Sequence, residues 1–395
     1  MANKVKASII LGDSFTFPEG DAATNRVYTY AKGLKENGLA VHVICFRNDY
    51  VTNHRGITDG INYHLPFRQT VRSPYFIIRR LNNLGKFLNT FRFFREIERE
   101  SKIENIITYT IRKDTQLFAY FLAKAFHASL ILERSEHPFK SYRTRIAEKT
   151  VGKFRVMFEI IFSDYIFCIS DYLMNFYRRN GAGETKLFKV PSTVDVTRFV
   201  NRVERKLQYK YICYSGSLTR EKDGVDILIR SYALIASEFP EVNLVLVGKA
   251  DTNDDEGFFR NLVAELNIQG RVLFTGKLPR NDIPAYICNA EVLALARPSS
   301  IVADAGFPSK VSEYLATGRA VVVTKVGEIP SYLTDNQDAF LADPDNVSDF
   351  AGKLRSALMD KVLADKVGLN GKEIARSVFN YQYQATRILR FLAKE

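Results

Sequence analysis

The sequence predicts an α/β protein made of two similarly built domains, each a parallel sheet flanked by helices. Short apolar runs alternate with helical patterns along the chain, which is the order that builds parallel sheets. This order begins afresh at residues 211–218, after a polar passage at 192–207. A chain of 395 residues is long enough for two or three separate cores. We therefore expect one Rossmann-like domain at 1–200 and a second at 201–380.

The first domain opens with a strand, a loop and a helix, which together form a βαβ unit with the next strand. The strands expected in this domain are 4–11, 41–46, 105–109, 129–133 and 164–170, with helices at 22–37 and 115–128. The loop after the first strand contains Gly12, Asp13, Gly20 and Asp21. It lies at the carboxyl end of its strand, where open α/β sheets bind ligands. Because it lacks the GxGxxG spacing, the loop does not indicate a dinucleotide site.

The second domain is organised around residues 306–324, which hold a turn, a helix and a strand. Strands are expected at 211–218, 243–247, 271–275, 291–296 and 320–323. Ser309 is expected to cap the helix that follows it, and Gly318 to end that helix. A helix that opens on a glycine-bearing loop directs free N–H groups at the space before it, which favours an anion there. The last helix, 384–393, can pack on either domain, so a return of residues 381–395 to the first domain is one of two options.

Net charge, cysteine spacing and apolar runs indicate which partners and which cellular compartment fit this chain. The formal net charge of +12 points to an anionic partner, although a basic protein without such a partner has the same total. The cysteines are scattered singly at Cys45, Cys168, Cys213 and Cys288, which predicts buried thiols of a reducing compartment. No apolar run reaches the ~18 residues of a membrane span, and no nucleic-acid-binding motif is recognised. We expect a cytoplasmic protein, or one peripheral to the inner face of the membrane.

Residues 74–99 combine an apolar stripe with many arginines. The stripe consists of Ile77, Leu81, Leu84, Leu88, Phe91 and Phe94. One interpretation is an interfacial helix that lies on an anionic membrane surface. The other is a face packed on the core with solvated basic flanks, which is the commoner origin of such spacing.

Four passages in this order resemble a known family. They are 164–170 with 190–199, 214–218 with Lys222 and Gly224, 274–276, and 306–324. Over nearly the whole chain the sequence resembles the family 4 (group 1) glycosyltransferases of GT-B fold. The resemblance implies two Rossmann-like domains that face each other across a deep cleft, with the acceptor bound by the first and the nucleotide sugar by the second.

The implied reaction is retaining transfer of a sugar from a UDP- or GDP-sugar to a saccharide or lipid-linked saccharide acceptor. It implies no bound metal and no bound cofactor, because the nucleotide sugar is a co-substrate. The expected context is bacterial surface polysaccharide synthesis. Two alternatives stay open: a GT-B-like nucleotide-sugar epimerase, and a non-catalytic scaffold that binds a nucleotide sugar.

The resemblance and the strand ends together name the candidate site residues. The catalytic candidates are Glu136, His137, Lys222 and Arg220. The candidates for the donor nucleotide are Gly216, Ser217, Lys222, Gly276, Lys277, Leu278, Ser309, Lys310, Val311 and Glu313. Those for the donor sugar are Asp304, Ala305, Gly306 and Phe307, with Gly12, Asp13, Gly20 and Asp21 in the cleft loop. Cations and helix N–H groups would stabilise the diphosphate leaving group, and Glu313 would bind the ribose.

The chain departs from the family pattern at two positions. The family usually has Glu-x7-Glu, but Ala305 stands where the first of these glutamates is expected, and Asp304 is one position away. Ser217 stands where the family tends to have arginine. Both departures concern the sugar and phosphate contacts, so they weaken the residue assignments there rather than the nucleotide site as a whole.

Overall fold

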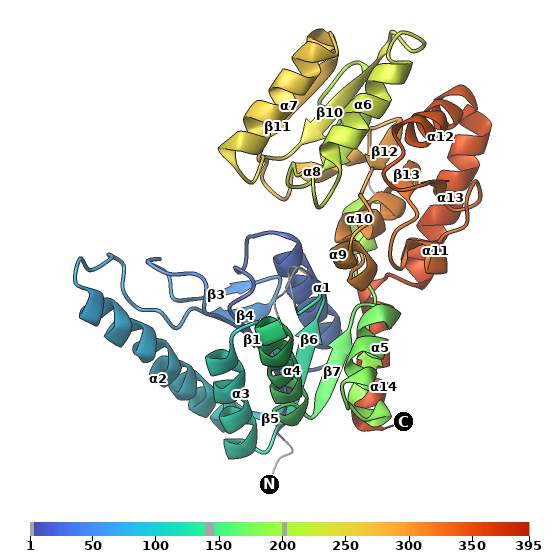
Figure 1. Ribbon diagram of the computed structural model, residues 1–395. Coiled ribbons are helices and arrows are strands. Elements are labelled where there is room, and N and C mark those ends of the chain that lie inside the picture. Colours follow the sequence, from blue (N-terminus) through green and yellow to red (C-terminus); the bar gives the residue numbers. More distant parts are fainter. Residues whose placement is uncertain (1–3, 139–145, 200–203, 395) are drawn as a thin grey trace. The chain divides into compact units, whose positions relative to one another are not determined.

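The computed structural model describes residues 4–138, 146–199 and 204–394, and its contacts divide the chain into two units (Figure 1). Unit 1 comprises Met1–Thr193 and Tyr381–Glu395, and unit 2 comprises Val194–Asn380. The chain thus passes from unit 1 to unit 2 after Thr193, whereas the sequence predicted this boundary after residue 200.

Unit 1 contains an 8-stranded sheet in the order β3-β4-β2-β1-β5-β6-β7-β8. Its strands are β1 (Val5–Gly12), β2 (Ala40–Cys45), β3 (Arg55–Thr58), β4 (Ile61–His64), β5 (Ser101–Tyr109), β6 (Ser129–Arg134), β7 (Tyr165–Cys168) and β8 (Leu187–Lys189). All pairs are parallel except β3 and β4, which form an antiparallel hairpin. Sequence order reverses on either side of β1, which creates a switch point between β1 and β5.

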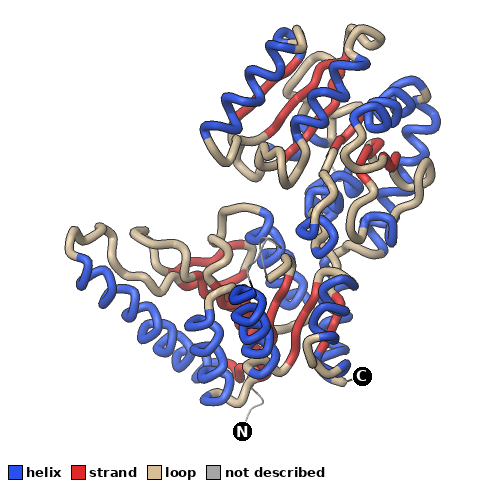
Figure 2. The backbone as a smooth tube through the Cα atoms, in the orientation of Figure 1, coloured by secondary structure: helices blue, strands red, loops and turns tan. Residues whose placement is uncertain are grey.

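Helices cover both faces of this sheet (Figure 2). They are α1 (Ala22–Glu36), α2 (Phe76–Glu100), α3 (Lys113–Ala125), α4 (Ile146–Ile161), α5 (Asp171–Arg179) and α14 (Tyr381–Ala393). In β1, Ile10 packs in the cluster formed with α1 and α14, while Ile9 and Leu11 pack in the cluster formed with α2 and α3. Side chains alternate between the faces of a strand, so an uninterrupted apolar run is required here.

The last helix returns to unit 1. Tyr381 of α14 donates a hydrogen bond from its hydroxyl to Glu36 of α1 over 2.7 Å. The two helices approach so closely that a Cβ atom at Gly33 would lie 2.6 Å from the Cβ of Ala385. Of the two options that the sequence left open, the structure therefore has the return of α14 to the first domain.

Unit 2 contains a 6-stranded, all-parallel sheet in the order β11-β10-β9-β12-β13-β14. Its strands are β9 (Lys210–Ser215), β10 (Val242–Val247), β11 (Val272–Gly276), β12 (Val292–Leu295), β13 (Ala320–Thr324) and β14 (Phe340–Ala342). This is the strand order of a Rossmann fold, with its switch point between β9 and β12. The loops that follow these two strands are where a ligand of such a sheet is expected.

The helices of unit 2 flank the sheet (Figure 2). They are α6 (Val225–Ile235), α7 (Asn253–Glu265), α8 (Ile283–Ile287), α9 (Ile301–Ala305), α10 (Ser309–Thr317), α11 (Ile329–Tyr332), α12 (Val347–Met359) and α13 (Lys361–Ser377). Gly318 ends α10 in the left-handed conformation at φ 78°, as predicted. The prediction that Ser309 caps this helix is wrong: Pro308 is the N-cap residue, and Ser309 is already helical. The fixed φ of proline brings the chain into the helix one residue earlier.

Helix α2 separates into a buried and an exposed half. Thr90, Phe93, Phe94 and Ile97 are buried on the sheet. Ile77, Leu81, Leu84 and Leu88, by contrast, are 59–71% exposed. The interpretation of the whole stripe as a core-packed face is therefore wrong for Ile77–Leu88 and correct only for Phe94. Among the described residues, no helix is long and apolar enough to cross a membrane.

Candidate functional site

The loops that follow β9 and β10 meet next to the switch point of unit 2, which lies between β9 and β12. Gly216 lies directly after β9 at φ 151°, and its N–H donates to the Val247 carbonyl of β10 over 2.9 Å. A Cβ atom on Gly216 would lie 2.6 Å from the Nζ atom of Lys310, and one on Gly248 would lie 1.8 Å from the Gly216 carbonyl oxygen. Glycine is thus required at both positions to let these loops and the Lys310 side chain come together.

Lys310 is in the first turn of α10, and its hydrogen-bond partners lie on β9 and on the loop after β9. Its Nζ donates to Asp223 Oδ2 over 2.7 Å and to the Tyr214 hydroxyl over 3.0 Å. Burial alone raises the pKa of Asp223, but attraction to Lys310 and the hydrogen bonds outweigh it, so the pKa of this carboxyl lies below its usual value. The structure therefore places the predicted nucleotide residues Gly216 and Lys310 side by side. It adds Asp223 and Tyr214, which the sequence did not single out.

Two further cations lie in the loop between β9 and α6. Arg220 pairs with Asp255 of α7 over 2.9 Å, and its guanidinium lies 4.4 Å from the centroid of the Phe258 ring. Lys222 and Ser217 are exposed. Gly224, at φ 63°, begins α6 immediately afterwards. The predicted phosphate-binding cations are thus on one loop, with Arg220 held by α7.

Glu313 is one turn further along α10. Its Oε1 lies 3.4 Å from Arg198 Nη1, and Arg198 also donates to the Arg280 carbonyl over 3.2 Å. Arg198 belongs to the short helix Val196–Phe199. Sequence reasoning missed this arginine as a site residue, although it lies inside the 190–199 passage that carries the resemblance.

The remaining donor candidates lie on two other segments. Gly276 ends β11 at φ 71°, and exposed Lys277 and half-buried Leu278 follow it. Asp304, in α9, is exposed, whereas Ala305 at the end of α9 and Gly306 and Phe307 in the turn before α10 are buried. The Phe307 ring packs on Tyr332 and Phe379, with centroids 5.8 and 5.0 Å away. Of the donor-sugar candidates, Asp304 is therefore the one that offers an exposed carboxylate.

In unit 1, the loop after β1 is held by its own acidic residues. Asp13 accepts hydrogen bonds from Thr110 Oγ1 and Thr115 Oγ1 over 2.8 and 2.7 Å. Asp21 caps α1 by accepting from the Ala23 N–H over 3.1 Å. Gly12 and Gly20 let the loop pack tightly, since a Cβ on either would lie 2.1 Å from an oxygen atom of Tyr109 or Thr24.

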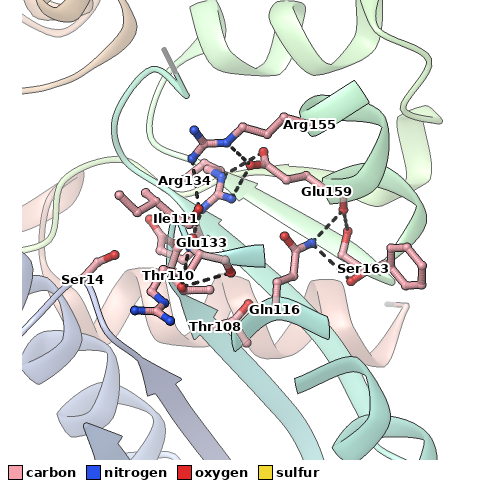
Figure 3. Close-up of polar contacts among 12 residues, drawn as sticks. Ser14, Thr108, Thr110, Ile111, Gln116, Glu133, Arg134, Arg155, Glu159 and Ser163 are labelled. Carbon is pink, nitrogen blue, oxygen red and sulfur yellow. Dashed lines mark hydrogen bonds and ion pairs between the residues drawn. The ribbon is translucent and has the colours of Figure 1, made fainter. Parts of the chain in front are cut away.

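A buried charge network lies at the carboxyl ends of β5 and β6 (Figure 3). Arg134 pairs with Glu159 of α4 over 2.8 Å, and its Nη1 donates to the Thr110 carbonyl over 2.6 Å. The Tyr177 hydroxyl donates to the same Glu159 over 2.6 Å. Burial opposes ionisation of Glu159, but Arg134 and these hydrogen bonds outweigh it, so its pKa is lowered. Next to this network, Glu133 pairs with Arg26 over 2.7 Å. The sequence did not predict either pair.

Glu136 and His137 follow β6 in the same unit. Glu136 is exposed, while His137 is buried with its ring 5.8 and 5.0 Å from the rings of Tyr172 and Phe176. Their predicted catalytic role with the cations of unit 2 stays a prediction. Within the described ranges, no group of three or more His, Cys, Asp or Glu residues is arranged to hold a metal ion.

Comparison with known protein families gives a match for unit 2. The family model described as glycosyl transferases group 1 matches residues 195–374, which lie within unit 2. Unit 2 is a group 1 glycosyltransferase domain. The switch-point loops and α10, which hold Gly216, Lys222, Lys310 and Glu313, all fall inside the matched range.

Relatives and solved structures extend this likeness to both units. An uncharacterized glycosyltransferase, YqgM of Bacillus subtilis, is 24% identical over 247 residues, which is 62% of this chain and 66% of that protein. The chain spans between about two fifths and two thirds of the length of the curated relatives it matches.

Two solved structures cover almost the whole chain. Sucrose-phosphate synthase of Thermosynechococcus elongatus gives a TM-score of 0.73 at 17% identity, covering 98% of each chain. Anabaena HepE in complex with UDP gives 0.69 at 13% identity, covering 98% of this chain and all of the other. The chain thus has the GT-B fold that the sequence predicted.

Proposed function

We propose that this group 1 glycosyltransferase transfers a sugar from a nucleotide-diphospho-sugar to a saccharide or lipid-linked saccharide, with retention at the anomeric carbon and without a bound metal. Unit 2 binds the donor, and unit 1 binds the acceptor. The expected setting is the assembly of a bacterial surface polysaccharide, with residues 74–99 on an anionic membrane surface. The proposal rests on the family match of unit 2, whose switch point brings together cations and the N-terminus of α10.

The chemistry fits a diphosphate leaving group. Its developing negative charge is stabilised by donors that are already in place before the bond breaks. Lys222 and Arg220 on the loop after β9 supply positive charge. The N–H groups of Ser309 and Lys310 open α10, whereas that of Val311 donates to the Pro308 carbonyl over 2.9 Å. A helix N-terminus adds to this attraction for an anion. HepE is solved in complex with UDP, and a relative in Mycolicibacterium smegmatis is named as GDP-mannose-dependent. Together they support a uridine or guanosine diphosphate as the carrier here.

Glu313 is proposed to accept hydrogen bonds from the ribose hydroxyls. It lies one helical turn beyond the phosphate-binding end of α10 and is 20% exposed at its side chain. Its contact with Arg198 orients the carboxylate for this purpose. Asp304 is proposed to contact the sugar in place of the missing first glutamate.

The test is thermal stabilisation of the full chain by UDP, GDP, ADP and CDP, with and without Mg²⁺, because a ligand of the native state raises the melting temperature. We expect a shift with UDP or GDP that does not require Mg²⁺. Glu313→Ala should lower that nucleotide's affinity about tenfold by removing a charged hydrogen-bond acceptor. Glu241→Ala, which changes an exposed glutamate on the same unit, should not. No shift with any nucleotide would contradict the donor site.

A further inference from the structure

A pocket of about 410 Å³ lies at the beginning of α2 in unit 1. It is lined by Arg72, Arg79 and Arg80 together with Asp49, Tyr50 and Phe76. This volume falls within the roughly 300–1,000 Å³ of small-molecule sites. The proposed transfer reaction does not use it, and none of its lining residues is among the predicted site residues.

The pocket carries surplus positive charge. Its carboxylate, Asp49, pairs with Lys86 over 2.7 Å, so it does not offset the arginines. In the part of the chain that the structure describes, none of the three arginines forms an ion pair. Arg79 donates to the Ser73 and Pro74 carbonyls over 3.0 and 2.7 Å, which fixes the turn before the helix. Planar guanidinium groups with free donors match the oxygens of a phosphate.

The end of α2 adds to this charge. The helix has 25 residues, and its N-cap residue, Tyr75, makes no side-chain capping hydrogen bond. Its first N–H groups and the positive end of its dipole therefore favour an anion at this end. The Arg80 guanidinium lies 5.0 Å from the centroid of the Phe76 ring, so the aromatic wall of the pocket also orients one of the cations.

An exposed apolar face continues from the pocket along the same helix. Phe76, Ile77, Leu81, Leu84 and Leu88 are 60, 71, 59, 59 and 66% exposed. A contiguous apolar surface of this kind marks a contact with another apolar phase. A soluble anion accounts for the arginines but not for this face. An anionic lipid accounts for both, since its head group carries the phosphate and its chains carry the apolar surface.

We propose that the pocket formed by Arg72, Arg79 and Arg80 binds the head-group phosphate of an anionic membrane lipid, with the apolar face of α2 inserted below the head groups. This inference deepens the membrane contact of the proposed function. It does not depend on nucleotide binding by unit 2.

The test measures, by co-sedimentation, the binding of the full chain to vesicles of phosphatidylcholine with and without phosphatidylglycerol. Arg72→Gln/Arg80→Gln removes two pocket cations and keeps Arg79, which fixes the turn. Arg92→Gln/Arg95→Gln removes two exposed cations further along the same helix and is the matched control. Each arginine at an anionic surface contributes roughly a factor of five in affinity. We therefore expect the pocket pair to lower affinity about thirtyfold and the control pair less than about fivefold.

A second variant tests the apolar half of the proposal. Ile77→Ser/Leu81→Ser should lower vesicle affinity at least about tenfold, because these side chains lose their transfer from water. Equal losses for the pocket and control pairs would overturn the pocket in favour of diffuse surface charge. Binding of inorganic pyrophosphate that the pocket variant abolishes, without any vesicle binding, would overturn the lipid in favour of a soluble anion.

The nucleotide experiment keeps the two proposals apart. All of these variants are in unit 1 and should leave the melting shift with UDP or GDP unchanged. Vesicle binding without any nucleotide shift would leave the lipid site standing and remove the donor site. A nucleotide shift without vesicle binding would do the reverse.

Discussion

The carboxyl ends of the two sheets carry charges that differ in access to solvent. In unit 1, the side chains of Glu133 and Glu159 are 1 and 2% exposed, and each pairs with a buried arginine. In unit 2, the buried pair of Lys310 and Asp223 is accompanied by Lys222, which is exposed. The carboxyl ends of the two sheets thus differ in whether all of these charged groups are buried in pairs or one of them is exposed to solvent.

This difference separates structural charge from charge available to a ligand. A buried ion pair whose donors and acceptors are satisfied within the protein holds its strand ends together but offers little to an anion. An exposed cation beside a helix N-terminus costs little to keep charged and can meet a phosphate. The network of unit 1 therefore fits a role in stability, and the cations of unit 2 keep their proposed role toward the leaving group.

The largest effect is expected for Glu159→Ala. This change leaves Arg134 buried without its partner, which typically costs about 3–5 kcal/mol. The free energy of unfolding of unit 1, measured with urea, should fall by that order. Asp343→Ala, which removes the partner of exposed Lys325, is the control and should cost less than about 1 kcal/mol. Similar losses for both variants would show that the unit 1 network is not structural.

Lys222→Ala should act on catalysis rather than on stability. Removing one preorganised charge from a transition state typically lowers turnover about a hundredfold, so we expect that loss in kcat/KM with an unchanged melting temperature. Lys325→Ala removes an exposed lysine from the end of β13 and serves as the control. If both variants retained full kcat/KM, Lys222 would have no part in the reaction.

The smallest effect concerns pH and should again distinguish the units. All five histidines lie between His42 and His137, in unit 1. Burial lowers the pKa of His42 to about 4 and that of His64 to about 3, and their ring nitrogens lie 3.1 Å apart.

These pKa values lie below the usual 6.5, so the unfolded chain binds protons first as pH falls. Stability of unit 1 is therefore full well above pH ~6.5 and declines toward pH ~3, by about 2 kcal/mol at pH ~6. Urea titrations at several pH values would measure this slope, and His42→Asn/His64→Asn should flatten it. An equal decline of unit 2 in the same window would contradict the assignment to these histidines.

The sequence was a good guide to the strands because of how they are buried. Strands covered on both faces must be continuously apolar, so β1, β9 and β13 were visible as short runs. The hairpin of β3 and β4 was missed, since an edge hairpin needs no such run and its residues are largely polar. For α2, periodicity identified the apolar stripe, but it does not determine whether a core covers the stripe.

The site was predicted less completely than the fold. Gly216, Lys310 and Glu313 were named from local patterns, and the structure brings Gly216 and Lys310 together. Asp223, Tyr214 and Arg198 were not named, because their contacts join segments far apart in the sequence. Tertiary contacts of this kind leave no local signal, although all three residues stand within or beside passages that carry the resemblance: Arg198 in 190–199, Tyr214 in 214–218, and Asp223 between Lys222 and Gly224.

The return of α14 to unit 1 also sets an order of assembly during synthesis. Domains generally fold as units from the N-terminal side as the chain emerges. Unit 2 has all of its residues once Asn380 has been made, whereas unit 1 lacks α14 until the residues after Asn380 have been made. The surface of α1 around Gly33 therefore stays uncovered by α14 at a stage when unit 2 already has all of its residues. A nascent chain stalled before Tyr381 would accordingly carry a finished second domain beside an unfinished first one.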